Sequence, residues 1–259
     1  MQKISLKTES QMKIMAEGGR KLARVKKALA KGVKPGVSAW DIEELANKLI
    51  EKEGAYPSFK KVPGYKWATC VNVNDGVVHG IPKKTVIFKD GDVVSVDVGI
   101  YYKGFHTDTA ISIHLEKTSS AYLGDESSKE KFLETGKKAM LAGIKQVKKG
   151  NKIGDISKAI EKVLFANNLN PVWALTGHGV GRDLHELPYI PCFADKSESQ
   201  ELVIGTGFVL AVEVMFTLGK GQLKEDSDGW TLRTKDAKIA GLWEETVAVT
   251  ANGPVVLTG

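Results

Sequence analysis

Polar and apolar side chains alternate most regularly over residues 92–113, DVVSVDVGIYYKGFHTDTAISI. Valine occupies every second position from Val94 to Val98, and a similar alternation runs from Asp108 to Ile113. A period of two residues is typical of a strand with one buried face. The segment therefore predicts two antiparallel strands that are joined by a tight turn.

The register of this hairpin decides how Asp97 and Asp108 are placed. A turn centred on Tyr102–Lys103 puts the two side chains directly opposite each other, with Cβ atoms about 5 Å apart. A turn centred on Lys103–Gly104 makes them diagonal neighbours on the same face, and only an odd-length loop without a bulge separates them. Two ionised carboxylates this close repel by about 3 kcal/mol at an effective dielectric constant of about 20. The pair therefore predicts a shared proton or a cation between them, unless both carboxylates flank a solvated sheet face.

Helical periodicity appears in four segments, at about residues 8–31, 38–54, 128–149 and 153–167. Thr8 with Gln11 forms a capping-box pattern at the start of the first helix, and Ser38 is the expected cap of the second. A polar surface loop is expected at residues 116–128, and the final third returns to the alternation of strands. The order of helices, strands, helices and strands predicts one mixed α/β (α+β) domain with two halves of similar build, at about residues 1–115 and 128–259.

The composition, 42% hydrophobic and 26% charged over 259 residues, is that of a globular protein. The net charge of +6 favours weak association with an acidic surface such as the ribosome, without indicating a nucleic-acid-binding protein. Cys70 and Cys192 form no CxxC pair, which indicates a reduced compartment. No apolar run approaches the roughly 18 residues of a membrane span, and the N-terminal segment lacks the apolar core of a signal peptide. We therefore expect a soluble, cytoplasmic protein.

Two further acidic residues, Glu213 in FVLAVEVMF and Glu244 in GLWEETVAVT, lie inside apolar strands, where a lone charge is expensive. With Asp97 and Asp108 they make four carboxylates that we expect to converge. His178, in the glycine-rich run TGHGVGRDLHELP, adds the commonest nitrogen ligand of transition metals. Four carboxylates and one imidazole predict two divalent ions about 3.5–4 Å apart, with bridging carboxylates and a bridging hydroxide.

Several other hydrolase classes are excluded by their missing motifs. His178 and His185 are seven positions apart and HELP is not HExxH, so the chain does not have the zincin pattern. The sequence also has no Gly-x-Ser-x-Gly elbow and no Gly-Lys-Ser/Thr phosphate loop.

The ordered motifs resemble those of type I methionine aminopeptidases, the short bacterial form, over essentially the whole chain. The matching segments are CVNVNDGVVHGIP, SVDVG with GFHTDTA, GHGVG with LHELP, VEVM, and DGWTLRTKD leading to WEETVAVT. The resemblance implies the pita-bread fold, in which pseudo-twofold halves and a central antiparallel sheet covered by helices surround a dinuclear metal site. It also implies removal of the initiator methionine from nascent chains with a small second residue. Glu213 and Glu244 are 31 positions apart, which leaves no room for the insert of type II enzymes.

The resemblance also implies roles for individual residues. It implies that two divalent ions, Co, Mn, Fe or Zn, are held by five ligands: Asp97, Asp108, His178, Glu213 and Glu244. His79 matches a histidine that contacts the substrate and assists catalysis, and His185 matches one that steadies the scissile carbonyl and its tetrahedral intermediate. Glu213 would also shuttle protons to and from the bridging hydroxide. His106 and His114 are expected to be ordinary strand residues.

Four positions match the pocket for the methionine side chain: Tyr65, Cys70, Leu184 and Trp230. For Tyr65 and Trp230, a plain role as core aromatics is the alternative. The sequence departs from the family at Leu184, where a Phe usually closes the pocket, at Val214, where proline usually follows the glutamate, and at Glu245, where histidine is common. Because all five expected ligands remain, we expect these departures to affect substrate selectivity more than chemistry.

Two alternatives stay open at this point. One is an Xaa-Pro peptidase of the same fold, which the run RDLHELPYI also resembles. The other is a non-catalytic pita-bread protein that docks a partner through its basic first helix, although such a protein is expected to have lost ligands. As partners we expect the N-termini of nascent polypeptides and the ribosome surface, with no DNA or membrane, and we expect a monomer.

Overall fold

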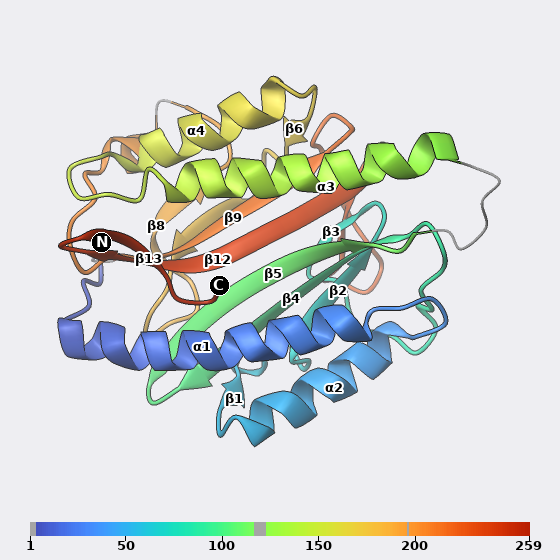
Figure 1. Cartoon of the computed structure of the whole chain (residues 1–259), viewed down its shortest axis with the longest axis horizontal. Helices are drawn as coiled ribbons and strands as arrows, with labels where there is room; N and C mark the ends of the chain where they lie inside the picture. Colours follow the sequence, from blue (N-terminus) through green and yellow to red (C-terminus); the bar gives the residue numbers. More distant parts are fainter. Residues whose placement is uncertain (1–3, 117–122, 196) are drawn as a thin grey trace.

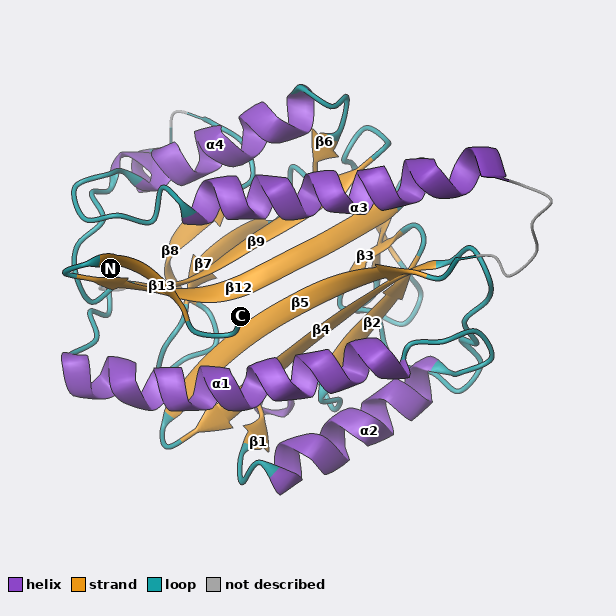
Figure 2. Ribbon diagram, in the orientation of Figure 1, coloured by secondary structure: helices purple, strands orange, loops and turns teal. Residues whose placement is uncertain are grey.

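The computed structural model describes residues 4–116, 123–195 and 197–259. In this part of the chain, ten strands form one sheet in the order β1-β4-β5-β12-β9-β7-β8, with β2 beside β4, β6 beside β9 and β13 beside β12 (Figure 2). The strands of the large sheet are β1 (Tyr56–Pro57), β2 (Thr69–Val73), β4 (Val93–Tyr102), β5 (Phe105–His114), β6 (Asn170–Pro171), β7 (Thr176–Gly179), β8 (Glu186–Pro191), β9 (Val209–Thr217), β12 (Ala240–Thr250) and β13 (Gly253–Val256). A smaller sheet contains β10 (Leu223–Glu225), β11 (Leu232–Thr234) and β3 (Gly76–Val78). Every pairing is antiparallel, as predicted.

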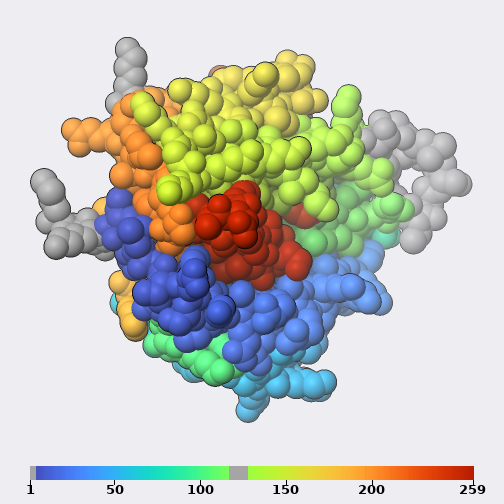
Figure 3. Space-filling view, turned by 60° about the vertical axis from the view of Figure 1, so that its left-hand side comes forward, coloured from blue at the N-terminus to red at the C-terminus, as the bar shows by residue number. Residues whose placement is uncertain are grey.

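Helices cover one face of the large sheet, with one pair over each half of it (Figure 1). The helices are α1 (Glu9–Gly32), α2 (Ala39–Lys52), α3 (Leu123–Ile144) and α4 (Ile153–Phe165), with short 3₁₀ turns η1 (Phe59–Lys61) and η2 (Glu198–Glu201). Helix α1 packs over β4 and β5, and α2 packs over β1 and β2. Helix α3 packs over β9 and β12, and α4 packs against α3, β6 and β8, so that each pair surrounds its own apolar cluster. The C-terminal residues, red in Figure 3, fill the space between α1 and α3, where Leu257 packs beside Met15. The division into residues 1–115 and 128–259 stays a prediction.

The first two helices begin where the capping boxes predict. Thr8 accepts a hydrogen bond from Gln11 N at 3.3 Å and Gln11 Oε1 accepts one from Thr8 N at 2.9 Å, and Ser38 forms the same reciprocal pair with Asp41. The expected loop at 116–128 is partly wrong, because α3 already begins at Leu123; residues 117–122 lie outside the described part. Helix α3 also ends at Ile144 and not near residue 149, because the chain turns there and reaches Gly150 at φ +94°.

The hairpin β4–β5 has the diagonal register of the two that the sequence allows. Its turn is centred on Lys103 and Gly104, at φ +47° and +90°, so Asp97 pairs with Ala110 and Asp108 pairs with Gly99. The directly opposed register is wrong. Two-residue hairpin turns of type I′ need positive φ at both central positions, and glycine meets this need at the second one. The two aspartates therefore share one face of the sheet as diagonal neighbours.

Among the described residues, no helix is long and apolar enough to cross a membrane.

Candidate active site

One row of paired residues across the large sheet assembles three of the carboxylates. Asp97 on β4 pairs with Ala110 on β5, and Ala110 pairs with Glu244 on β12. Glu244 pairs in turn with Glu213 on β9, and Cys70 on β2 lies beside Asp97 at the other end. Paired residues on neighbouring strands point to the same face of a sheet. The three acids therefore lie in line, and the methyl group of Ala110 leaves space between them.

Asp108 and His178 complete the set from neighbouring positions. Asp108 lies two residues from the row along β5 and so faces the same side, while His178 reaches the row from β7, which pairs with β9. One ligand atom each of Asp108, His178 and Glu244 lies within 4.8 Å of the other two. Nε2 of His178 lies 3.5 Å from Oε1 of Glu213. The fold thus brings together all five residues that were predicted as ligands, from five different strands.

Glu245, next to the row, points to the opposite face of the sheet. Its carboxylate pairs with Lys26 of α1 at 2.5 Å and accepts a hydrogen bond from the Thr258 hydroxyl at 2.5 Å. Because adjacent residues of a strand face opposite sides, Glu244 must face away from α1. The departure at position 245 therefore belongs to a partly buried ion pair beneath α1 and not to the ligand set. Its effect on selectivity stays a prediction.

The acidic row is short of hydrogen-bond donors. Within the described residues, Asp97 Oδ1 and Glu244 Oε1 are buried without a hydrogen-bond partner. A buried carboxylate oxygen that has neither donor nor cation is costly. Nδ1 of His178 donates to the Gly179 carbonyl at 2.9 Å, which leaves Nε2 as a lone-pair donor toward the acids, as in metal-binding histidines. An oxygen-rich set with one imidazole fits divalent metal ions.

The electrostatics of the set favour exchange of protons for cations. Burial raises the pKa of Asp108 to about 7. Burial is also the largest cause of the raised pKa values of three further carboxyls, and the negative charge of Asp108 raises these pKa values further. The three carboxyls are those of Asp97, Glu213 and Glu244. Burial lowers the pKa of His178 to about 3. The imidazole is therefore neutral and the carboxyls bind protons tightly, so a bound cation would release those protons.

A cavity of about 470 Å³ adjoins these acids, and every residue predicted for the site lines it. Tyr65, Cys70 and Leu184 are buried in one apolar cluster at this cavity, and Trp230 packs against them. The rings of Tyr65 and Trp230 meet edge to face, with centroids 5.0 Å apart. The Tyr65 hydroxyl donates to the Thr69 carbonyl at 2.9 Å. The wall is thus both apolar and fixed in place.

His79 and His185 also line this cavity. His79 follows β3 directly and has a positive φ of +57°, and the ring of His185 lies edge to face with that of His178, with centroids 4.5 Å apart. Burial lowers the pKa of both His79 and His185. Both rings are therefore neutral near pH 7 and able to donate one N–H each. His106 and His114 lie on β5 as predicted, and Nδ1 of His106 is 2.8 Å from the Ser58 hydroxyl.

The sequence analysis missed further lining residues of the cavity: Phe59, Val62, Val78, Ala174, Leu175, Thr176 and Tyr189. They are apolar or neutral and carry no chemical motif. The only available signal was position, because Val78 directly precedes His79, and Ala174 and Leu175 directly precede the glycine-rich run around His178.

Residues 13–251 match metallopeptidase family M24. The chain belongs to this family. Among its M24 relatives, the methionine aminopeptidase of Aquifex aeolicus is 38% identical, with 98% of each chain covered. Methionine aminopeptidase 1 of Bacillus subtilis is 36% identical over 98% of this chain and 99% of the relative. The crystal structure of the Thermotoga maritima methionine aminopeptidase superposes with a TM-score of 0.92 at 35% identity and covers 99% of both chains.

The M24 fold extends to more distant proteins. Prolidase from Pyrococcus furiosus superposes with a TM-score of 0.75 at 18% identity, and only 65% of that chain is covered. This likeness concerns the fold alone. The predicted pita-bread fold and the predicted metallopeptidase class are confirmed, and the non-catalytic alternative loses its basis because no expected ligand is missing from the cluster.

Proposed function

We propose that this M24 metallopeptidase removes the N-terminal methionine from peptides and nascent proteins whose second residue is small. One observation carries the proposal: the acidic row, which has few hydrogen-bond donors, lies beside a cavity with an apolar wall that contains the rings of Tyr65 and Trp230. The row suits divalent cations, and the wall suits an unbranched apolar side chain. Relatives that cover nearly the whole chain bear the name methionine aminopeptidase.

Two divalent ions, Co, Mn, Fe or Zn, are proposed for the acidic row. Asp97, Asp108 and Glu244 would hold them together with His178 and Glu213. Support comes from the count of donors, because four carboxylates and one imidazole exceed what a single ion needs. When bound, such ions polarise the scissile carbonyl and lower the pKa of a water molecule.

The methionine side chain is proposed to lie against Tyr65, Trp230 and Leu184. Sulfur–aromatic contacts with the two rings contribute about 0.3–1.5 kcal/mol beyond burial. Cys70 lies at the inner end of this wall, beside Asp97 in the row. When the side chain of a substrate methionine is bound there, the amino group and the scissile bond of that residue would lie toward the acids.

The proton transfers are assigned to Glu213, and stabilisation of the substrate carbonyl is assigned to the two neutral histidines. As a carboxylate at the edge of the acidic row, Glu213 would accept the proton of the attacking water. It would return that proton to the amide nitrogen of the leaving peptide, so that water and the peptide bond are converted to free methionine and a new N-terminus. N–H groups of His79 and His185 would hydrogen-bond the substrate carbonyl and its developing negative charge.

The proposed partners are nascent polypeptide chains in the cytoplasm, with no DNA or membrane as a partner. The protein is proposed to act on them as a monomer. A ribosome contact would use the exposed cations of α1: Lys13, Arg20, Lys27 and Lys31. Other cations of this helix are already engaged within the protein, since Arg24 pairs with Glu53 at 2.6 Å and Lys26 pairs with Glu245.

A panel of short peptides tests this function. Metal-free protein should be inactive, and Mn²⁺ or Co²⁺ should restore release of methionine from Met-Ala-Ser. Glu213→Gln keeps the shape of the site but removes both a proposed ligand and the proton acceptor, so it should stay inactive with either metal. Faster release of the first residue from Ala-Pro-Ser than from Met-Ala-Ser would overturn the methionine assignment in favour of an Xaa-Pro peptidase.

A further inference from the structure

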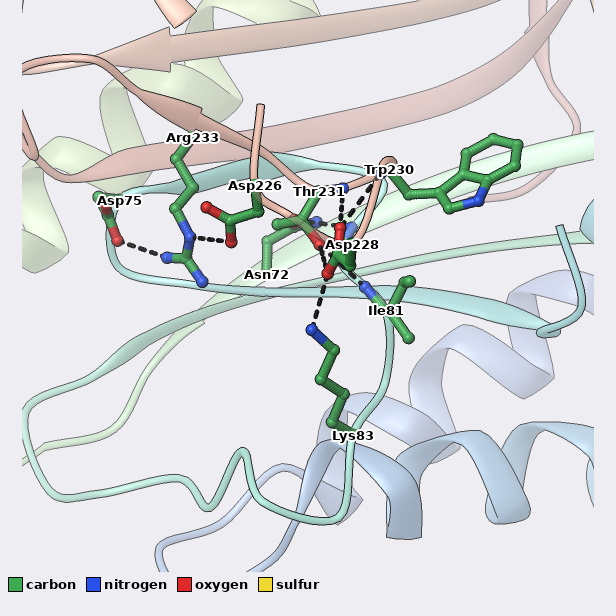
Figure 4. Close-up of polar contacts among 10 residues, drawn as sticks. Asn72, Asp75, Ile81, Lys83, Asp226, Asp228, Trp230, Thr231 and Arg233 are labelled. Carbon is green, nitrogen blue, oxygen red and sulfur yellow. Dashed lines mark hydrogen bonds and ion pairs between the residues drawn. The ribbon is translucent and has the colours of Figure 1, made fainter. Parts of the chain in front are cut away.

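Two loops that carry site residues meet at one carboxylate outside the cavity (Figure 4). The first loop follows His79 and contains Ile81 and Lys83. The second contains Asp228 and leads to Trp230. Lys83 and Asp228 are 145 positions apart in the chain, yet Lys83 Nζ lies 2.7 Å from Asp228 Oδ2. The contact joins the segment behind His79 to the segment that carries one wall of the proposed methionine pocket.

Asp228 accepts hydrogen bonds from its own loop with both oxygens. Oδ1 accepts from the backbone N–H groups of Trp230, at 3.1 Å, and Thr231, at 2.9 Å. Oδ2 accepts from the Thr231 hydroxyl at 2.9 Å, and that hydroxyl accepts in turn from Ile81 N at 3.4 Å. The Thr231 hydroxyl therefore provides a second hydrogen-bonded connection between the two loops. The carboxylate fixes the backbone of Trp230 directly.

Asp228 is suited to this role because its charge is well solvated by these donors. Burial alone would raise the pKa of its carboxyl, but the hydrogen bonds from Lys83, Thr231 and Trp230 outweigh burial and lower that pKa. Charge-assisted hydrogen bonds of this kind are about twice as strong as neutral ones. The loop is thus held by an ionised carboxylate at neutral pH.

The position of Trp230 decides the width of the pocket. Its ring lies 5.0 Å from the ring of Tyr65, edge to face, and lines the cavity. On the other side its edge abuts Gly64, where an added Cβ would come within 3.3 Å of Trp230 Cζ2. In Figure 4 the indole extends away from Asp228, so the carboxylate acts on the ring only through the backbone.

We propose that Asp228 is a specificity-determining positioning residue, which holds Trp230 against the first side chain of the substrate and, through Lys83, ties this wall to the loop of His79. The inference rests on the proposed function, since it concerns the same pocket. Release of Trp230 widens the pocket. A methionine side chain of the substrate then loses contacts with the indole, and a branched side chain such as leucine loses fewer. The acidic row, on other strands, is unaffected.

The chain offers a matched control in Asp226. This carboxylate is two residues from Asp228 and also forms an ion pair, with Arg233 Nε at 2.6 Å, while Arg233 bonds Asp75 at 2.7 Å (Figure 4). Among the described residues, the Asp226 side chain forms no hydrogen bond to Trp230 or Thr231. Asp226→Asn therefore removes a neighbouring charge pair without freeing the pocket wall.

The experiment compares wild type, Asp228→Ala, Asp228→Asn, Lys83→Met and Asp226→Asn as full-length, Mn²⁺-loaded proteins. The substrates are Met-Ala-Ser and Leu-Ala-Ser, and binding of free L-methionine and L-leucine is measured by calorimetry. For Asp228→Ala we expect KM for Met-Ala-Ser to rise about tenfold and the preference for methionine over leucine to fall about tenfold, within the range that one apolar contact controls. Values of kcat and the Mn²⁺ content should stay within about twofold of wild type.

Asp228→Asn keeps an acceptor for the two N–H groups and should therefore recover most of the preference for methionine. The preference of Lys83→Met should fall between those of Asp228→Ala and Asp228→Asn.

Unchanged KM and preference in Asp228→Ala, or an equal loss in Asp226→Asn, would overturn the inference. If Asp228→Ala does not fold, Lys83→Met decides, because it removes the ion pair and keeps the loop: a KM and a preference equal to those of wild type would then overturn the inference. The wild-type arms separate this inference from the proposed function. A wild type that prefers L-methionine in calorimetry but cleaves no Met peptide contradicts the function alone, and the binding preference of the variants then decides the inference.

Discussion

Two regions of this protein bury carboxylates, and they treat the charge in opposite ways. Glu43 on α2 is 3% exposed and accepts hydrogen bonds from Ala68 N at 2.8 Å, from the Thr69 hydroxyl at 2.7 Å and from the Asn47 amide at 2.7 Å. In the acidic row, Asp97 and Glu244 each keep a buried oxygen to which no described residue donates. Buried polar groups are normally hydrogen-bonded, so these two oxygens differ from those of Glu43.

The difference separates a structural acid from a binding acid. The hydrogen-bond donors around Glu43 satisfy its carboxylate and fix the start of β2, which carries Cys70. The row leaves its oxygens open toward a cavity, where a cation can take the place of the missing donors. Burial of an acid is therefore a weak sign of a metal site, and the absence of donors is a stronger one.

Removal of one ligand should have the largest effect. Asp108→Ala should lose divalent metal and turnover together, with a fall larger than the roughly 100-fold that loss of an outer hydrogen-bond partner of a metal ligand costs. Metal content by elemental analysis and methionine release from Met-Ala-Ser measure both quantities. Full activity in a metal-free Asp108→Ala protein would refute the assignment of the row.

His185 should separate chemistry from metal binding. Its predicted action is on the substrate carbonyl, so His185→Ala should lose about 10²–10³ in kcat, as for loss of one donor to a developing negative charge. Metal content should stay at the wild-type value. If occupancy fell along with the rate, His185 would be a ligand and its assigned role would be wrong.

Glu43 should show the reverse pattern, with an effect on stability alone. Glu43→Ala leaves buried N–H groups without an acceptor, which costs about 1–3 kcal/mol in the free energy of unfolding. Urea denaturation measures this loss, and Glu44→Ala, at an exposed site on the same helix, is the matched control. Metal affinity should not change, and a loss of metal in Glu43→Ala would erase the distinction between the two regions.

The pH dependence of the metal-free protein should sharpen the same comparison. Burial raises the pKa of Asp108 to about 7, whereas an unfolded Asp titrates at about 3.9. The folded state therefore binds this proton more tightly, so its contribution to stability is full below the unfolded pKa and is lost as pH rises through the folded one. We expect the Tm of metal-free protein to fall by a few degrees between about pH 5 and 8, and excess Mn²⁺ to remove this fall. A rise in Tm over that interval would contradict the account.

Leu184 should have the smallest effect. It is shorter than phenylalanine, so discrimination between methionine and leucine should be loose, and Leu184→Phe should tighten it about tenfold, near the lower end of what an apolar pocket achieves. Competition between Met-Ala-Ser and Leu-Ala-Ser measures this. Equal preference in the two proteins would show that residue 184 does not set the width of the pocket.

Local patterns predicted what depends on local physics. The capping boxes at Thr8 and Ser38 and the alternation around Asp97 were sufficient for α1, α2 and the central hairpin, because caps and strand faces involve residues a few positions apart. The register required the φ of Lys103, which the alternation alone does not contain. All predicted site residues line one cavity, but their assignment came largely from the family resemblance.

What the sequence did not reveal depends on partners far along the chain. Nothing in the helix pattern distinguishes Glu43, since its donors come from residues 68 and 69. Asp228 likewise depends on Lys83, 145 positions away. Even Glu245, adjacent to a predicted ligand, could be placed only once its ion pair with Lys26 was visible.

Titration of Mn²⁺ into metal-free protein tests the central claim most directly. The donor-poor row, and not the buried acid on α2, should bind the metal. Wild type and Glu43→Gln should therefore bind two Mn²⁺ ions per chain with equal affinity, while Glu244→Gln should lose at least one of them. Unchanged binding by Glu244→Gln, or loss of binding by Glu43→Gln, would contradict the account.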